Sequence, residues 1–170
     1  PITSKISLGE VEFHALATRN WYDKLAIAGL NFGPDFQSME KIETDRKSSA
    51  MRARSTVTYQ NGGGSGVDTQ SDYIMHPITI DSLLQTALIA SSSGVLSKVT
   101  CKVPTAIEIA CFRAPSSDAT RVGWTVDAIS NPVGPGSIQI SAEIHKDGEV
   151  CGQFINVSAV AFQGAMQDES

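Results

Sequence analysis

The residues best suited to acid–base chemistry lie close together between positions 73 and 85. His76 and Pro77 are followed by a single carboxylate, Asp81, and by Gln85 four residues later. Asp81 stands in the first turn of an apolar helical stripe, so Gln85 lies one turn further on the same side and both side chains can contact one substrate. Burial raises the pKa of such a carboxyl group, whereas the helix N-terminus lowers it. If burial dominates, Asp81 can donate a proton near neutral pH.

A structural interpretation of the same residues stays open. Asp81 could simply cap or complement the start of its helix, and the spacing alone favours that reading. His76 could tie the preceding loop to the backbone through a hydrogen bond. The sequence therefore leaves two interpretations of Asp81 open: a general acid, or a structural residue at the helix start.

A second segment joins a short apolar helix to a rigid turn. Asn20 is expected to cap a helix over residues 20–28, which ends at Gly29. The turn that follows contains Phe32, Gly33 and Pro34. Ordinary helix termination would explain this pattern without any function.

The elements that position these residues can be predicted from hydrophobic periodicity. The apolar stripe that starts at Ile80 predicts the longest helix, which ends in the Ser-rich stretch 91–94. Period-two alternation and apolar content predict strands over residues 36–44, 51–59, 103–109, 122–128, 138–144 and 150–162, with an extended stretch over 11–16. Asp147 and Gly148 are typical of a tight hairpin turn. One long helix and an antiparallel sheet make an α+β fold, with the helix covering one sheet face.

Composition restricts the classes of function. The 170 residues suit one domain with its own core, and the net charge of -5 argues against non-specific nucleic-acid binding. The three cysteines fit neither a zinc site nor a set of disulfides, which indicates a reducing, cytoplasmic compartment. No apolar run reaches the roughly 18 to 20 residues that span a membrane. The start at Pro1 suggests a piece of a longer chain.

Three ordered patterns together resemble the C-terminal half of the dehydratase domain of polyketide synthases, especially the highly reducing iterative enzymes of fungi. Residues 22–37 match Tyr-x-x-Leu-x-x-x-Gly followed by a Tyr-Gly-Pro-x-Phe-Gln turn, and residues 76–85 match His-Pro-x-x-Leu-Asp-x-x-x-Gln. Val103 and Pro104 resemble the family's next strand. Two positions depart from the patterns: Phe32 replaces the tyrosine and Ile80 the leucine.

The resemblance implies half of a double hotdog, in which a long helix is wrapped by a curved antiparallel sheet. It implies a lead-in over residues 1–18, a hotdog subdomain over 19–164 with a Gly- and Ser-rich loop over 60–70, and a tail over 165–170.

The resemblance also implies the chemistry. Asp81 would be the general acid that protonates the departing hydroxyl of a β-hydroxyacyl thioester, and Gln85 would orient either Asp81 or that hydroxyl. The pocket and its entrance would be formed by Tyr73, His76, Pro77, Phe32, Gly33 and Pro34. The substrate would arrive on the phosphopantetheine arm of an acyl carrier protein, so neither a diffusible cofactor nor a metal is implied.

The partner histidine of this chemistry is missing, because no His-x-x-x-Gly-x-x-x-x-Pro motif occurs in the chain. The N-terminal hotdog half would supply it, so this chain alone is expected to be inactive. Its uncovered apolar surface predicts a homodimer. Further partners would be the other synthase domains. Three alternatives remain: a non-catalytic hotdog module, a product-template cyclisation domain, and, least favoured, a single-hotdog thioesterase or hydratase.

Overall fold

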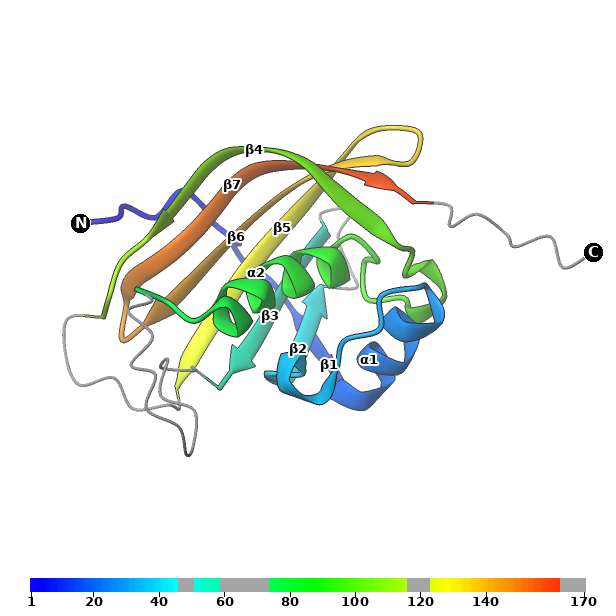
Figure 1. The fold of residues 1–170 in the computed structure, drawn as a ribbon, viewed down its shortest axis with the longest axis horizontal. Helices are drawn as coiled ribbons and strands as arrows, with labels where there is room; N and C mark the ends of the chain where they lie inside the picture. Colours follow the sequence, from blue (N-terminus) through cyan, green and yellow to red (C-terminus); the bar gives the residue numbers. More distant parts are fainter. Residues whose placement is uncertain (46–50, 59–73, 116–122, 163–170) are drawn as a thin grey trace, which may run out of the picture.

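The chain folds into one curved antiparallel sheet with a long helix on its concave face (Figure 1). The computed structural model describes residues 1–45, 51–58, 74–115 and 123–162. In chain order the elements are β1 (Phe13–Leu16), α1 (Thr18–Ile27), the 3₁₀ turn η1 (Pro34–Phe36), β2 (Met39–Asp45), β3 (Met51–Val57), α2 (Pro77–Ala90), the 3₁₀ turn η2 (Leu96–Lys98), β4 (Lys102–Phe112), β5 (Trp124–Gly134), β6 (Ser137–Lys146) and β7 (Glu149–Ala161).

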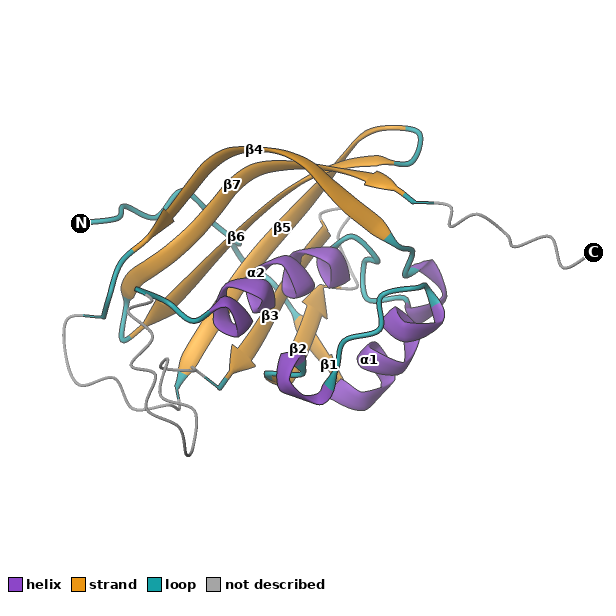
Figure 2. Cartoon of the chain, in the orientation of Figure 1, coloured by secondary structure: helices purple, strands orange, loops and turns teal. Residues whose placement is uncertain are grey.

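The seven strands are ordered β1-β2-β3-β5-β6-β7-β4, and each neighbouring pair is antiparallel. The chain leaves the sheet after β3, forms α2 across the concave face, and returns at the far edge as β4 (Figure 2). α1 and η1 pack beside the β1–β2 end of the sheet. This is the hotdog arrangement, so the predicted α+β class and the wrapped helix are confirmed.

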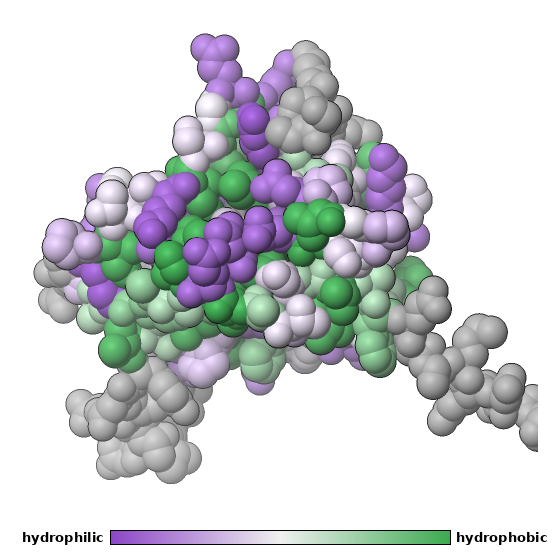
Figure 3. All heavy atoms as spheres, turned by 90° about the horizontal axis from the view of Figure 1, so that it is seen from above, coloured by the Kyte–Doolittle hydropathy of each residue, from purple (hydrophilic) through white to green (hydrophobic). Residues whose placement is uncertain are grey.

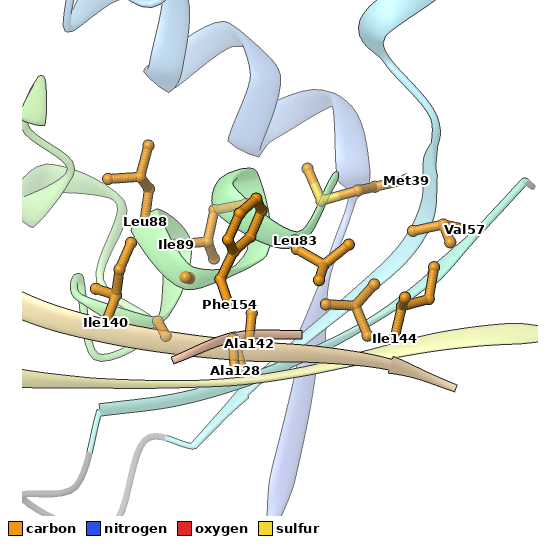
Figure 4. Packing of buried hydrophobic residues seen from close by; sticks show 14 of the residues in the cluster. Met39, Val57, Leu83, Leu88, Ile89, Ala128, Ile140, Ala142, Ile144 and Phe154 are labelled. Carbon is orange, nitrogen blue, oxygen red and sulfur yellow. The ribbon is translucent and has the colours of Figure 1, made fainter. Parts of the chain in front are cut away.

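The core fills the space between α2 and the sheet. Leu83 and Ile89 on α2 face Ile140 and Ile144 on β6, and these four side chains have at most 1% of their surface exposed (Figure 4). Fully burying one such side chain stabilises the fold by roughly 1.5–3 kcal/mol. The concave face is therefore the apolar face that holds α2 in place.

The strand periodicity is largely confirmed. On β3, Ala53 and Val57 are buried while Arg52 and Arg54 are half-buried on the opposite face. The predicted hairpin joins β6 to β7, and the backbone φ angles of its two turn residues, 51° at Asp147 and 80° at Gly148, are those that Asp-Gly turns favour. The Gly- and Ser-rich loop lies outside the described residues.

The predicted boundaries at Asn20 and Phe36 are wrong. α1 begins at Thr18, so Asn20 is not its cap; the cap position is Ala17, which makes no side-chain capping bond. The strand expected over residues 36–44 begins only at Met39, because the Gly-Pro turn continues as η1. Backbone conformation after a proline therefore overrode the apolar pattern.

The sheet face opposite α2 carries an ion cluster. The guanidinium of Arg54 on β3 donates two hydrogen bonds to Asp127 on β5, of 2.6 and 2.9 Å, and the Nε2 atom of His145 on β6 lies 3.2 Å from the same carboxylate. Only 26% of the His145 side chain is exposed. Burial alone would raise the pKa of Asp127, but the hydrogen bonds from His145 and Arg54 lower it below its ordinary value.

The lead-in segment is attached to this same face. The buried carboxylate of Glu143 on β6 accepts hydrogen bonds from the hydroxyl of Ser4 and from the backbone N–H groups of Lys5 and Ile6, at 2.7, 2.5 and 3.2 Å. Arg52 donates to the carbonyl of Leu8 at 2.5 Å. The lead-in is therefore an ordered part of the hotdog.

None of the helices in the described ranges is long and apolar enough to cross a membrane. Cys101, Cys111 and Cys151 are free thiols.

Candidate active site

The helix that carries the candidate acid begins earlier than its apolar stripe. Pro77 is the first residue of α2, and the Nδ1 atom of His76 accepts a hydrogen bond of 3.2 Å from the N–H of Ile78. Proline suits this position because the N–H that it lacks would have no helical partner. The structural interpretation of His76 is thus confirmed, and His76 is the N-cap of α2.

Asp81 therefore lies in the second turn of α2 and not in the first. The interpretation of Asp81 as a cap is wrong, because His76 occupies the cap position. An acidic residue this far from the helix start gains little from the helix dipole, whose influence is confined to the first turn. The helix dipole therefore does not explain why α2 has a carboxylate at this position.

The side chain of Gln85 holds the carboxylate of Asp81. The Nε2 atom of Gln85 donates a hydrogen bond of 2.5 Å to Oδ2 of Asp81 and another of 3.0 Å to the backbone carbonyl of Phe36. Gln85 is completely buried. The predicted proximity of Asp81 and Gln85 on one helix face is confirmed.

Tyr22 on α1 completes the network. Its hydroxyl donates to Oε1 of Gln85 at 3.0 Å and accepts from the N–H of Met39 at 3.2 Å. Gln85 of α2 thus contacts Tyr22 of α1 and Phe36 of η1, and the Met39 N–H of β2 joins the network through Tyr22. Sequence reasoning included Tyr22 in a motif but did not identify it as a site residue.

Burial sets the protonation behaviour of the site. Burial raises the pKa of Asp81, and the hydrogen bond from Gln85 offsets only part of the rise. Burial likewise raises the pKa of Tyr22 to about 12; the hydrogen bond from Met39 lowers it and the charge of Asp81 raises it. Asp81 is therefore a weaker acid than an ordinary aspartate, and the Tyr22 hydroxyl stays protonated at physiological pH.

Of the remaining predicted residues, Phe32 contacts this network. Phe32 is half-buried and packs edge-on against the Tyr22 ring, with the ring centroids 6.4 Å apart. Gly33 and Pro34 are exposed, and the Gly33 carbonyl accepts a hydrogen bond of 2.9 Å from the Phe36 N–H, which closes the turn. Pro77 is exposed at the helix start, whereas Tyr73 lies outside the described residues.

A hollow of about 440 Å³ lies beside Tyr22. It is lined by residues of α1, the loop that follows and the start of β2: Thr18, Arg19, Tyr22, Asp23, Ala26, Asn31, Phe32, Gln37 and Met39. Asp81 does not line it. Within residues 1–45, 51–58, 74–115 and 123–162, no three His, Cys, Asp or Glu side chains are grouped so as to hold a metal ion.

Solved structures with the same fold are dehydratase domains. The chain superposes on the dehydratase domain of PpsC from Mycobacterium tuberculosis with a TM-score of 0.70 at 20% identity, over 94% of this chain and 55% of that one. For the dehydratase domain of RzxB from Pseudomonas fluorescens the TM-score is 0.63 at 13% identity, over 86% and 49%. The chain thus matches about half of each domain.

Sequence relatives are fungal synthases. The chain is 40% identical over 155 residues to the highly reducing polyketide synthase srdA of Neurospora crassa, and 29% identical over 152 residues to anuA of Penicillium roqueforti. These alignments cover 91% and 89% of this chain but only 6% and 7% of those proteins. A family model described as the polyketide synthase dehydratase N-terminal domain matches residues 9–168. The chain therefore belongs to the polyketide synthase dehydratase family.

Proposed function

We propose that this chain is the half of a polyketide synthase dehydratase domain that contributes the general acid, Asp81. The observation that carries the proposal is the buried Asp81–Gln85 pair on α2, in which burial raises the pKa of Asp81 while Gln85 fixes one of its carboxyl oxygens. A carboxyl group with these properties is suited to donate a proton to a leaving group.

In the proposed reaction a β-hydroxyacyl thioester loses water. A base removes the α-proton, the Cα=Cβ double bond forms, the Cβ–O bond breaks, and Asp81 protonates the departing hydroxyl. The products are an α,β-enoyl thioester, water, the Asp81 carboxylate and the protonated base. Transfer of the proton from the base back to Asp81 restores the starting state, so the reaction needs no oxidant or reductant.

The base is proposed to come from the other hotdog half. The chain contains no histidine in a His-x-x-x-Gly-x-x-x-x-Pro setting, and it matches only about half of the solved dehydratase domains. The family model that matches the chain is described as the N-terminal domain of the dehydratase. We therefore assign the chain to the C-terminal half on three features of its sequence: Asp81, Gln85 and the absent histidine. Alone, the chain is expected to be inactive.

The surrounding residues receive supporting roles. Gln85 orients Asp81, while His76 and Pro77 fix the start of α2 and with Tyr73 shape the pocket. Gly33 and Pro34 line the entrance, beside Phe32. The acyl chain is proposed to arrive on the phosphopantetheine of an acyl carrier protein, and the other synthase domains are the remaining partners.

The missing half would cover an apolar edge. Among the described residues, β4 pairs only with β7, and it carries Val103 and Ile107, which are 40% and 48% exposed. Across the surface seen from above, hydrophobic side chains lie among hydrophilic ones (Figure 3). An open strand edge with exposed apolar residues is a template for pairing with another chain. When isolated, this chain is proposed to pair with a second copy of itself.

A non-catalytic hotdog module is the second candidate. Two sequence features favour it: the absent histidine and the phenylalanine at position 32, where the family pattern has tyrosine. In that case Asp81 would remain buried beside Gln85 without donating a proton to a substrate. Only a reaction assay separates the two functions.

The test is mass spectrometry of an acyl carrier protein loaded with a β-hydroxyacyl chain. It is incubated with this chain alone, with this chain joined to the preceding half of its parent synthase, and with the joined domain carrying Asp81→Asn. The matched control is Asp147→Asn, which removes a carboxylate from the β6–β7 turn, where asparagine tolerates the positive φ.

A mass loss of about 18 Da corresponds to one water molecule. Asp81 is supported as the acid if this loss occurs with the joined wild-type and Asp147→Asn domains and in no other sample. Dehydration that survives Asp81→Asn would overturn that role. No dehydration in any sample would favour the non-catalytic module.

A further inference from the structure

In the part of the chain that the structure describes, the Tyr22 hydroxyl has one acceptor available for its proton. A backbone N–H can only donate, so the hydroxyl oxygen accepts from Met39 and its proton points to Oε1 of Gln85. Because the pKa of Tyr22 is about 12, the hydroxyl remains a donor throughout the range in which an enzyme works.

This donor fixes the orientation of the Gln85 amide. The amide oxygen faces the Tyr22 hydroxyl, and both hydrogens of Nε2 are used, one by Oδ2 of Asp81 and one by the Phe36 carbonyl. A flipped amide would place Oε1 against two oxygen acceptors and leave the Tyr22 proton facing an N–H donor. In a completely buried side chain each such mismatch leaves a polar group without a hydrogen bond, which disfavours the flipped amide.

The orientation of the amide decides which oxygen of Asp81 can carry a proton. Nε2 of Gln85 has no lone pair available to accept, so Oδ2 of Asp81 must accept in both protonation states. The acidic proton of Asp81 is therefore confined to Oδ1. If the amide were flipped, Oε1 would accept that proton from Oδ2 and keep it from any substrate.

We propose that Tyr22 is a positioning residue that, through Gln85, confines the transferable proton of Asp81 to Oδ1. The catalytic meaning of this arrangement rests on the proposed function, but the hydrogen-bond network itself does not. The hydrogen-bond network connects three elements: it contains Tyr22 from α1, Gln85 and Asp81 from α2, and the Met39 N–H from β2.

The groups that face Asp81 are few. Gln85 follows it on α2, and Tyr22 approaches from α1 as the ionisable group coupled to it in the part of the chain that the structure describes. Phe36 of η1 and Met39 of β2 contribute only backbone groups to the network. A change at Tyr22 is therefore expected to reach Asp81 through Gln85.

The experiment uses the complete parent synthase and measures the pH dependence of dehydration. Tyr22→Phe keeps the ring that packs on Phe32 but removes the hydroxyl. It weakens the orientation of Gln85 and raises the pKa of Asp81, because the hydrogen bond that stabilises the carboxylate becomes less well directed. Since the acid must be protonated, the alkaline limb of the rate profile should move to higher pH. The kcat should fall about tenfold, with KM unchanged.

The matched control is Thr86→Val. Thr86 is also completely buried on α2, and its hydroxyl bonds to Ser55 and not to Asp81. This variant should lose stability but keep the alkaline limb. In a Gln85→Met background, adding Tyr22→Phe should change neither kcat nor the limb, because the link between Tyr22 and Asp81 is already removed.

A second variant tests the sign of the effect if Tyr22→Phe does not fold. 3-Fluorotyrosine at position 22 keeps the ring and makes its hydroxyl a stronger donor, so the limb should move to lower pH. The inference would be overturned if the alkaline limb of the rate profile stays at the wild-type pH in whichever of the two Tyr22 variants folds. An undiminished effect of Tyr22→Phe in the Gln85→Met background would also overturn it. An active Asp81→Asn synthase would instead overturn the proposed function, which keeps the two failures distinct.

Discussion

The Nε2 atom of Gln85 lies 2.5 Å from Oδ2 of Asp81 and 3.0 Å from the carbonyl oxygen of Phe36. The amide is committed to this bond because Tyr22 occupies its oxygen. A carboxyl group that is desolvated and yet hydrogen-bonded on one oxygen combines a raised pKa with a fixed direction. These are the two properties that a general acid needs.

The raised pKa of Asp81 predicts that the carboxylate destabilises the fold. The favourable contribution of a group whose pKa is raised by folding is complete below its unfolded value and is lost as the pH rises through the folded value. Asp81→Asn should therefore increase the free energy of unfolding at pH 7 relative to wild type, with the difference disappearing near pH 3. Urea denaturation at both pH values measures this.

The control for this experiment is Asp147→Asn, since Asp147 lies in a turn. It should leave the stability difference between the two pH values unchanged. Equal stability of Asp81→Asn and wild type at pH 7 would contradict the desolvation of Asp81.

The cap of α2 gives a second prediction. His76→Ala removes the acceptor for the Ile78 N–H and should lower the free energy of unfolding by about 0.5–2 kcal/mol. His76→Asp keeps an acceptor at the same position and should retain most of the stability. Thermal unfolding by circular dichroism compares the two variants; similar losses in both would show that the cap bond is not the cause.

The helix boundary shows what the sequence could and could not predict. The apolar stripe of α2 was readable because burial against the sheet imposes the helical period. The apolar stripe predicts a helix start at Ile80, but α2 begins at Pro77. The His76 cap and Pro77 add a first turn that has little apolar character, so the stripe does not reveal it. Pro77 was the available signal, since proline favours the first helical position.

The site could be predicted only in part. Asp81 and Gln85 are four residues apart on one helix, so local geometry brings them together. Tyr22 is separated from Gln85 by 63 residues, and the two meet only because α1 and β2 pack against α2. The ion pair between Arg54 and Asp127 likewise depends on the register of β3 with β5, which alternation alone does not specify.

The Arg54–Asp127 pair yields a third prediction. Asp127→Asn removes the charge that accepts from Arg54 and His145, and at pH 7 it should lower the free energy of unfolding by about 1–3 kcal/mol. Because folding lowers the pKa of Asp127, its contribution is present above the unfolded pKa and is lost as the pH falls through the folded pKa. The variant and wild type should therefore converge in acid.

Urea titrations from pH 7 down to pH 2 follow this convergence. Lys41→Met is the control, because it breaks an ion pair with Glu43 on β2 in which the lysine side chain is 58% exposed. An exposed pair contributes about 0–1 kcal/mol, so the control should show a small loss. A constant deficit of Asp127→Asn across the whole pH range would exclude an electrostatic origin.

The open edge of the sheet predicts the behaviour of the isolated chain. Ile107→Lys places a charge on β4 and should shift a self-associated chain toward the monomer, since charged residues prevent edge-to-edge pairing. Val133→Lys is the matched control, because Val133 is 61% exposed but lies at the end of β5, away from the β4 edge. Light scattering at several concentrations separates them; a wild-type chain that is monomeric at high concentration contradicts the prediction.

Gly152 on β7 predicts the effect of a single added methyl group. A Cβ atom at this position would lie 2.6 Å from Cδ1 of Phe112 and 3.1 Å from Cγ2 of Ile144. The Phe112 ring cannot retreat freely, because it packs edge-on against Phe154 with the centroids 5.2 Å apart. Gly152→Ala should therefore lower the free energy of unfolding by about 1–3 kcal/mol through overpacking. Gly134→Ala meets no atom within 4 Å and should be neutral or slightly stabilising, so equal urea midpoints for the two variants would rule out the steric explanation.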